Sequence, residues 1–397
     1  MTCPHCQEDA RCKGFRPRQV VSLLGALQLW RHYYHCAHCH QGTFPRDQLL
    51  GLRGHDLTPA ADEVVCLAGL LSSFAQAADD TLQRLTGLRV CESSVERATE
   101  AAGSRLAEAL AEGQTFGTPA DWAWHKDAEG KTVAYVLGDS TGVALQGPHG
   151  AEAEGRMANV LAIANPVPEE RERWADPSRQ QPPPWQARYL AALRPWSELG
   201  EVARRQGGQV GMNRADRWVA LCDGANGLDD FLAKSFPRVE AVILDFWHAA
   251  EYLGKLSKAL HPNDEAAAES WRGVWCHRLK HEGGQAVLEA LRGLAVQGRA
   301  ARACHEEVVR YFTNQVQRMD YPTYRAKGWC IGSGVVESAC KRVVGQRLKG
   351  GGMRWGEEGA DALCHLRALF LSDKGQWNAF WERQVNKRPI NYQRMSR

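Results

Sequence analysis

The chain has 397 residues, 44% of them hydrophobic and 24% charged, which is an ordinary balance for a globular protein. A chain of this length is expected to form about two or three domains and to bury at least one full hydrophobic core. The formal net charge of +3 is too small to indicate a nucleic-acid partner by itself, so the distribution of charge must decide.

No apolar run in the sequence approaches the roughly 20 residues that span a bilayer, and the first residues lack the apolar core of a secretory signal. We therefore expect no membrane partner and a cytoplasmic location. In that compartment the 13 cysteines are expected to be reduced or metal-bound rather than paired with one another.

Residues 1–57 contain two Cys-x2-Cys pairs, which predict a zinc-ribbon-like module. Thiolates at this spacing supply four tetrahedral ligands from two short turns, the usual arrangement of a structural Zn²⁺ site. Strand-like segments on both sides of Gly25 provide the hairpin that such a ribbon needs, although the two pairs are further apart than is common. The predicted zinc ligands are Cys3, Cys6, Cys36 and Cys39.

The same module is rich in basic side chains, which suits contact with phosphates. These side chains are Arg11, Lys13, Arg16, Arg18 and Arg31. A structural zinc site without a DNA role is the alternative interpretation.

Residues 58–111 are predicted to form three helices. The first starts at a Thr-Pro pair, the second ends at Gly87, and SSVE (93–96) matches a capping box at the start of the third. Two helices, a glycine turn and a capped third helix are compatible with a helix-turn-helix DNA-binding domain, whose last helix enters the major groove and would present Arg97 to DNA. A plain helical bundle is an equally good interpretation.

Residues 112–130 contain several helix breakers and no sustained period, so we expect a linker there. The segment 131–260 then reads as an α/β domain with five strands. The predicted strands cover residues 132–137, 141–146, 159–164, 218–222 and 241–244. One helix is predicted over residues 186–206, kinked at Pro195, a second over residues 228–236, and a third from Asp245.

The resulting order, β-β-β-α-β-α-β-α, is that of a ribonuclease-H-like mixed sheet. In this topology the first and fourth strands are neighbours. Asp139 leaves the first strand and Asp223 leaves the fourth, so we expect the two carboxylates to converge at one edge of the sheet. Asp245 closes the fifth strand and competes with Asp223 as the second acid. A Rossmann-type domain is not indicated, because its Gly-x-Gly-x-x-Gly turn is missing from the sequence.

The last third of the chain is expected to complete this domain. Residues 261–325 are predicted to form a helical insertion, and residues 326–372 the final helices of the catalytic core. Residues 373–397 are predicted to be a basic tail.

Glu337 is the third candidate acid. A helix from about residue 335 would place it on one side with Lys341, Val344 and Leu348. The segment 338–356 contains five basic residues and no acid, which indicates a track for DNA phosphates. The predicted DNA contacts here are Lys341, Arg342, Arg347, Lys349 and Arg354. A surface ion pair between Glu337 and Lys341 is the alternative role for this glutamate.

Together, Asp139, Asp223 and Glu337 are predicted to bind two Mg²⁺ (or Mn²⁺) ions. Two cations about 3.5–4 Å apart activate the attacking oxygen and stabilise the leaving oxygen of a phosphodiester. Hard cations of this kind prefer carboxylate ligands. Each acid alone could instead be a turn or helix-cap residue, so the prediction depends on the fold bringing the three together.

Five segments carry a resemblance to a known family: GDSTGV (138–143), AEGRMANV (153–160), DRWVALCDGANGL (216–228), VEAVILDFWHAAEYL (239–253) and IGSGVVESACKRVVGQRLKGGGMRW (331–355). They resemble bacterial insertion-sequence transposases of the DDE class, most closely the ISKra-type family. The cysteine pairs and the helices after them are also similar, so the resemblance covers nearly the whole chain.

The resemblance implies a ribonuclease-H-like core that cuts and joins DNA at transposon ends, with a helical insertion before the third acid. Asp139, Asp223 and Glu337 match the DDE positions. Asp245 and His248 match a D/C-x2-H signature, which implies a supporting role for both. The partners it implies are double-stranded DNA, as transposon ends and target, and further copies of the chain, in a bacterial cytoplasm and at the nucleoid.

Two other functions remain open at this point. The first is a non-catalytic DNA-binding regulator or domesticated transposase derivative, based on the zinc-ribbon and helix-turn-helix segments. The second is a structure-specific nuclease that cuts DNA without joining strands.

Overall fold

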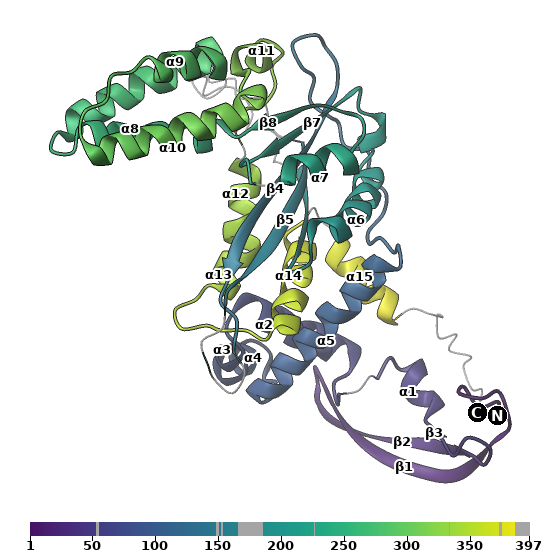
Figure 1. The fold of residues 1–397 in the computed structure, drawn as a ribbon. Helices are drawn as coiled ribbons and strands as arrows, with labels where there is room; N and C mark the ends of the chain where they lie inside the picture. Colours follow the sequence, from purple (N-terminus) through teal and green to yellow (C-terminus); the bar gives the residue numbers. More distant parts are fainter. Residues whose placement is uncertain are drawn as a thin grey trace, which may run out of the picture.

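A mixed five-stranded sheet lies at the centre of the molecule, in the order β6-β5-β4-β7-β8 (Figure 1). This computed structural model describes residues 1–52, 55–147, 151, 154–165, 186–225, 227–332, 334–372 and 375–385. The strands are β4 (Val133–Val143), β5 (Arg156–Asn165), β6 (Gln186–Ala192), β7 (Arg217–Cys222) and β8 (Val239–Leu244). β4 pairs antiparallel with β5 and parallel with β7. The predicted contact between the first and fourth strands of this sheet is therefore confirmed.

One of the strand predictions was wrong. Residues 141–146 do not turn back as a separate strand, because β4 continues past Asp139 and stays paired with β5 as far as Val143. Pairing with β5 keeps the backbone extended at Gly138-Asp139, where the prediction had ended the first strand. The sheet also contains a strand that was not predicted, β6, which pairs with β5.

The predicted helix over residues 186–206 was also wrong. Its first half is β6, and α6 (Trp196–Gln209) starts only after Pro195, which is its N-cap. The strand-forming half has an edge of β5 to pair with, and this tertiary partner overrides the helical pattern. Proline has no backbone N–H, so it is well suited to the start of a helix and poorly suited to its interior.

Helices cover both faces of the sheet. Along β4, Ala134 and Val136 pack on one side with residues of α6 and α7 (Leu228–Ser235). Tyr135 and Leu137 pack on the other side with residues of the C-terminal helices. This alternation is the two-residue period of a strand that is buried on both faces. The segment predicted as a linker is packed rather than loose, and Trp124 in it donates a hydrogen bond of 3.2 Å to the carbonyl of Gly211.

Three long helices form an arm that extends away from the sheet: α8 (Phe246–Leu260), α9 (Glu265–Arg292) and α10 (Arg299–Gln315) (Figure 1). The helical prediction for this part of the chain is confirmed. Two short helices, η5 (Val316–Arg318) and α11 (Tyr321–Ala326), lead back to the sheet. Among the described residues, none of the helices has both the length and the apolar character needed to cross a membrane.

The N-terminal module (residues 1–57) lies at the other end of the molecule (Figure 1). It consists of β1 (Ala10–Ser22), β2 (Gly25–Cys36), β3 (Gly42–Thr43) and α1 (Pro45–Leu49). The predicted hairpin around Gly25 is confirmed, and the φ of +111° at Gly25 explains why this turn takes glycine.

The helices of residues 58–111 are α2 (Pro59–Leu71), α3 (Phe74–Gln76), the π-helix η1 (Ala77–Thr81), α4 (Leu82–Thr86) and α5 (Glu92–Ala111). The predicted stop at Gly87 is confirmed, in the left-handed conformation. The predicted capping box was wrong, because α5 already starts at Glu92 and its N-cap is Cys91. α5 packs against both α2 and α14, and a Cβ at Gly103 would lie 2.2 Å from the carbonyl oxygen of Ala362.

The C-terminal elements are α12 (Gly334–Ala339), the π-helix η6 (Cys340–Gly345), α13 (Gln346–Leu348), α14 (Glu357–Leu371) and α15 (Gln376–Val385). The segment predicted as a tail therefore begins with a helix, and Trp377 and Phe380 of that helix are buried. Residues 373–374 and 386–397, the rest of the predicted basic tail, lie outside the described residues.

Two buried arginines join α2 to the C-terminal helices. Arg367 on α14 donates hydrogen bonds of 2.7 Å to the carbonyl of Leu70 and 2.6 Å to that of Val343, and a third to the carbonyl of Arg342. Arg347 donates a hydrogen bond of 2.8 Å to the carbonyl of Gly69.

The guanidinium of Arg347 lies 4.6 Å from the ring centre of Phe74 and 4.7 Å from that of Trp355. Its residue is only 2% exposed, so the prediction that Arg347 contacts DNA was wrong. Burial lowers the pKa of both Arg347 and Arg367 to about 10.

We predict that Arg367→Met destabilises the protein by about 3 kcal/mol, because two buried carbonyls and one partly buried carbonyl lose a charged donor. Chemical denaturation followed by circular dichroism measures this change. Arg84→Met is the matched control: Arg84 is exposed and pairs only with Asp80 one turn away, so its replacement should leave the midpoint nearly unchanged. Equal midpoints for both variants would contradict the prediction.

Candidate functional site

Four cysteines of the N-terminal module form a group that can bind a structural metal such as zinc. The sulfurs of Cys3 and Cys39 are 3.6 Å apart, those of Cys6 and Cys36 are 3.5 Å apart, and all four lie within 4.8 Å of one another. Sulfurs bound at 2.3 Å to a tetrahedral zinc would be about 3.8 Å apart, so the observed spacing fits that ion. The thiol group is therefore arranged as the sequence predicted.

The backbone around these turns favours thiolates, the form that binds metal. The N–H groups of His5 and Cys6 point at the sulfur of Cys3 and lower its pKa to about 7. The pKa of Cys36 is lowered in the same way by the N–H groups of Cys39 and His38. Burial and the neighbouring sulfurs raise the pKa of Cys6 to about 12 and also raise that of Cys39, so the four thiols do not ionise together without a cation.

We predict that the purified protein binds about one zinc per chain and that Cys36→Ser removes it, since a three-thiol site with one serine binds zinc poorly. Elemental analysis by mass spectrometry measures the ratio of zinc to protein. Cys12→Ser is the control, because Cys12 is exposed and does not belong to the four-sulfur group. Zinc retained by Cys36→Ser and lost by Cys12→Ser would overturn the assignment.

The second site lies where β4 and β7 run side by side. Gly138 of β4 and Cys222 of β7 form the last pair of the parallel ladder. Asp139 continues β4, whereas Asp223 is the first residue after β7 ends, and the two carboxylates are close enough for the charge of Asp223 to act on Asp139. Both aspartates are half-buried, and each accepts a hydrogen bond from a backbone N–H close to it in sequence, Asp139 from Ser140 and Asp223 from Ala225.

The electrostatic state of Asp139 shows that the two carboxylates interact. Burial raises the pKa of Asp139 above its ordinary value, and the negative charge of Asp223 raises it further. A hydrogen bond from the thiol of Cys340, the N–H of Ser140 and the nearby His248 act in the opposite direction. Ionising Asp139 in the folded protein therefore costs free energy, and a cation bound beside it would offset that cost.

Cys340 is the site residue that the sequence analysis missed. It is the first residue of η6, is 7% exposed, and donates its thiol hydrogen bond to Asp139. It lies in the block that was singled out for Glu337, three positions further on. Its only sequence signal was the apolar character of that face, because an isolated cysteine predicts no particular role.

Glu337 is not beside the aspartates in this structure. Its side chain is 52% exposed and accepts a hydrogen bond of 2.6 Å from Lys341. Among the described residues, the four cysteines are the only group of three or more metal-ligand side chains within 4.8 Å of one another. The fold thus brings Asp139 and Asp223 together and leaves Glu337 on the neighbouring helix, which packs on β4 and β5.

The predicted common face of Glu337, Lys341, Val344 and Leu348 was wrong. Val344 and Leu348 are fully buried, whereas Glu337 and Lys341 are exposed. The reason is η6: a π-helix has more residues per turn than an α-helix, so the later residues rotate away from the face of the earlier ones.

The two supporting residues differ in role. Asp245 is the N-cap of α8: its carboxylate accepts a hydrogen bond of 2.8 Å from the N–H of Trp247, and the residue is 2% exposed. His248 is partly exposed, lies 3.9 Å from Glu251, and is close enough to affect the pKa of Asp139.

Four of the five basic side chains predicted to contact DNA in this block are exposed: Lys341, Arg342, Lys349 and Arg354. Lys349 donates a hydrogen bond to the hydroxyl of Thr141, two residues beyond Asp139 on β4. Arg97 on α5 is also exposed.

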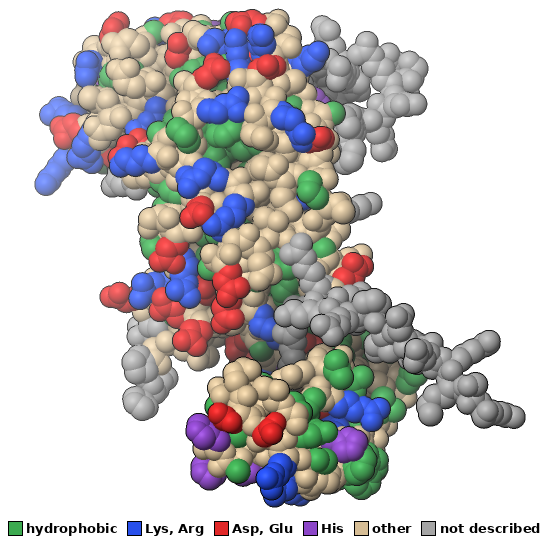
Figure 2. Space-filling model, turned by 90° about the vertical axis from the view of Figure 1, so that its right-hand side faces the viewer, with side chains coloured by type: hydrophobic (Ala, Val, Ile, Leu, Met, Phe, Trp, Pro, Cys, Tyr) green, Lys and Arg blue, Asp and Glu red, His purple; other side chains and the backbone are tan. Residues whose placement is uncertain are grey.

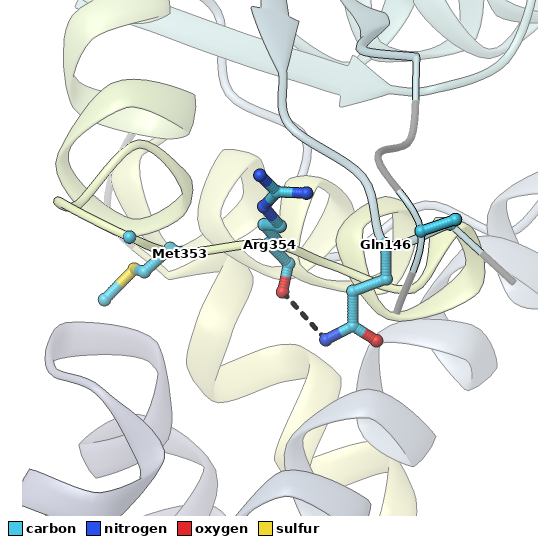
Figure 3. Close-up of a pocket in the computed structure, with 6 residues that line it drawn as sticks. Gln146, Met353 and Arg354 are labelled. Atoms are coloured by element: carbon cyan, nitrogen blue, oxygen red, sulfur yellow. Dashed lines mark hydrogen bonds between the residues drawn. The ribbon is translucent and has the colours of Figure 1, made fainter. Parts of the chain in front are cut away.

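Arg354 borders a cavity of about 480 Å³. The cavity is lined by Gln146, Gly147, Ala151, Gly352, Met353 and Arg354. Gln146 donates a hydrogen bond of 3.2 Å to the carbonyl of Arg354, whose guanidinium points away from Gln146 (Figure 3). The cationic group of Arg354 is therefore not used in holding the two segments together.

Comparison with known proteins does not assign the chain to a family. No protein-family model matches it, and no curated protein matches it as a relative. The functional assignment therefore depends on the geometry of the two sites.

We predict that Asp139→Asn stabilises the protein, and that the gain grows as the pH rises above about 4, the ordinary pKa of an aspartate. The raised pKa of Asp139 means that the folded state keeps its proton at pH values where the unfolded chain has lost it, so the wild type loses stability as the pH rises through that interval. Thermal unfolding at several pH values measures the difference. Asp230→Asn, at an exposed carboxylate, is the control and should show no such trend.

Proposed function

We propose that the protein is a DDE-type transposase that cleaves DNA and transfers strands at the ends of an insertion sequence, similar to the ISKra-type family. The observation that carries this proposal is the placement of Asp139 and Asp223 directly after the last paired residues of neighbouring parallel strands, Gly138 and Cys222, next to the helix that bears Glu337. The strand order and the helical arm inserted before Glu337 support a ribonuclease-H-like core.

In this proposal Asp139, Asp223 and Glu337 hold two Mg²⁺ or Mn²⁺ ions. When bound, the ions would activate the attacking oxygen, first of water and then of a 3′-hydroxyl, and stabilise the oxygen that leaves. The oxygen donors suit these cations, and the repulsion between Asp139 and Asp223 favours cation binding. Glu337 has to leave Lys341 and turn towards the aspartates when the cations bind.

The other named residues of this chain have roles that follow from their positions. Cys340 orients the carboxylate of Asp139 through its hydrogen bond, and His248 contributes a nearby group that can carry positive charge. Lys349 and Arg354 are exposed beside β4 and can contact DNA phosphates, which fixes the position of the strand without reading its sequence. Asp245 holds the start of α8 and thereby the position of His248.

The zinc module and α5, with Arg97, would add further contacts to double-stranded DNA in this proposal. Assembly of several copies on the two transposon ends follows from the resemblance. The helix-turn-helix role of α5 is part of the proposal, and contact with DNA there is limited to the sides of α5 that α2 and α14 leave exposed.

A second candidate function is a non-catalytic DNA-binding regulator derived from a transposase. The observation in its favour is the ion pair between Glu337 and Lys341, which keeps the third carboxylate away from the other two. A protein that binds terminal-repeat DNA and never nicks it with Mg²⁺ or Mn²⁺ would support this function.

We predict that Asp223→Ala abolishes cleavage of transposon-end DNA and leaves DNA binding intact, because a metal ligand is lost and no basic residue is changed. A nicking and strand-transfer assay with labelled element ends measures activity, and a gel-shift assay measures binding. Glu251→Gln is the control: this exposed acid lies near His248 but outside the proposed ligand set, so cleavage should continue.

Glu337→Gln should lose cleavage as completely as Asp223→Ala does. Full activity of Glu337→Gln beside an inactive Asp223→Ala would remove Glu337 from the ligand set. Unchanged cleavage by Asp223→Ala would falsify the proposal as a whole.

A further inference from the structure

The hairpin of the N-terminal module has two unlike faces. In the β1–β2 register, Phe15 is opposite His32, Pro17 opposite Trp30, and Gln19 opposite Gln28. Paired residues of an antiparallel sheet point to the same side, so these six side chains share one face. We call the face made by these six residues the aromatic face.

The opposite face is covered by the rest of the module. Arg31 is 7% exposed there, and it and Arg18 both bind the carboxylate of Asp47 on α1. Arg18 also donates a hydrogen bond of 2.9 Å to Asp56. Two of the acidic residues of the module, Asp47 and Asp56, are thus paired with arginines of the covered face.

The aromatic face is open to solvent. Phe15 is 59% exposed and Trp30 is 54% exposed. This exposure is unusual, because phenylalanine and tryptophan side chains in folded proteins usually bury most of their large apolar area. The rings of Phe15 and His32 have centres 4.1 Å apart, and His32 lies 6.3 Å from Tyr34. The result is a row of ring surfaces on a rigid strand pair, next to the four-cysteine group that can hold the two strands at their far end.

The charges around this face are positive. Residues 1–57 contain seven Lys and Arg and four Asp and Glu. Lys13 is exposed at the register shift of β1 just before Phe15, and it forms no ion pair with a carboxylate among the described residues. Arg11 is paired with His35 and points to the opposite side of the hairpin. Histidines also gather at this end of the molecule, beside hydrophobic, basic and a few acidic side chains (Figure 2).

We propose that the aromatic face binds unpaired nucleotides, with bases stacking on Phe15, Trp30 and His32 and phosphates held at Lys13. Base stacking on aromatic side chains with cations along the backbone is how proteins hold single strands. A duplex hides the faces of its bases, so it does not match this surface. The mixture of rings with Gln19 and Gln28, inside a basic rim, is also less apolar than the core of a protein interface.

The carboxylate site is not needed for this binding. That the strand is DNA rests on the proposed function, whereas the stacking itself does not. An unpaired strand is available wherever the ends of a duplex open around a cut.

The test is binding of the full-length zinc-loaded protein to a fluorescent 15-mer of thymidine, followed by anisotropy without Mg²⁺. Trp30→Ala and Phe15→Ala should each weaken binding by roughly 5- to 150-fold, the range found for loss of one stacked base. Trp30→Phe should recover most of the affinity. Leu24→Ala is the matched control, because Leu24 is 97% exposed at the hairpin turn and outside the aromatic face.

Zinc content and thermal unfolding of each variant show that the module is intact. Three results would overturn the proposal: wild-type affinity of Trp30→Ala, tighter binding of the matching duplex with the same dependence on Trp30, or a change of oligomeric state in Trp30→Ala with no change in binding. The last result would make the face an interface between copies of the chain.

Asp223→Ala should bind the 15-mer as the wild type does. Loss of cleavage in that variant with normal binding separates the two proposals. If the protein binds a 15-mer of uridine and not the 15-mer of thymidine, the stacking role of the aromatic face is supported and DNA is excluded as its ligand.

Discussion

Contacts between buried guanidinium groups and backbone carbonyls determine where the C-terminal helices lie. Arg367 binds carbonyls at the end of α2 and within η6, and Arg347 binds one more carbonyl of α2. Buried carbonyls without a donor are costly, so these bonds favour one position of η6 relative to α2. The π-helical segment depends on this arrangement, because its carbonyls at residues 342 and 343 receive donors from α14.

The position of η6 in turn decides the environment of the aspartates. With η6 in place, the thiol of Cys340 donates a hydrogen bond to the carboxylate of Asp139. The paired strands β4 and β7 fix Asp223 beside it. The result is a carboxylate whose ionised form is disfavoured by burial and by a like charge, a condition common at functional sites and also possible in structural clusters.

The two candidate metal sites differ in whether their ligand atoms already lie close enough together to bind an ion. The four sulfurs of the N-terminal module already have the spacing of a tetrahedral site, so an ion can enter without rearrangement. In the proposed carboxylate site, by contrast, Glu337 is bonded to Lys341 and does not lie together with Asp139 and Asp223.

The sequence by itself determined the features that depend on near neighbours. The cysteine turns, the hairpin turn at Gly25, the helix stop at Gly87 and the strand that precedes Asp223 follow from local spacing and backbone preference. Only the tertiary structure decided that β4 continues past Asp139 and that Arg347 is buried. β4 continues because it pairs with β5, and Arg347 is buried against the rings of Phe74 and Trp355. These partners are distant along the chain, so the local periodicity of the sequence carries no information about them.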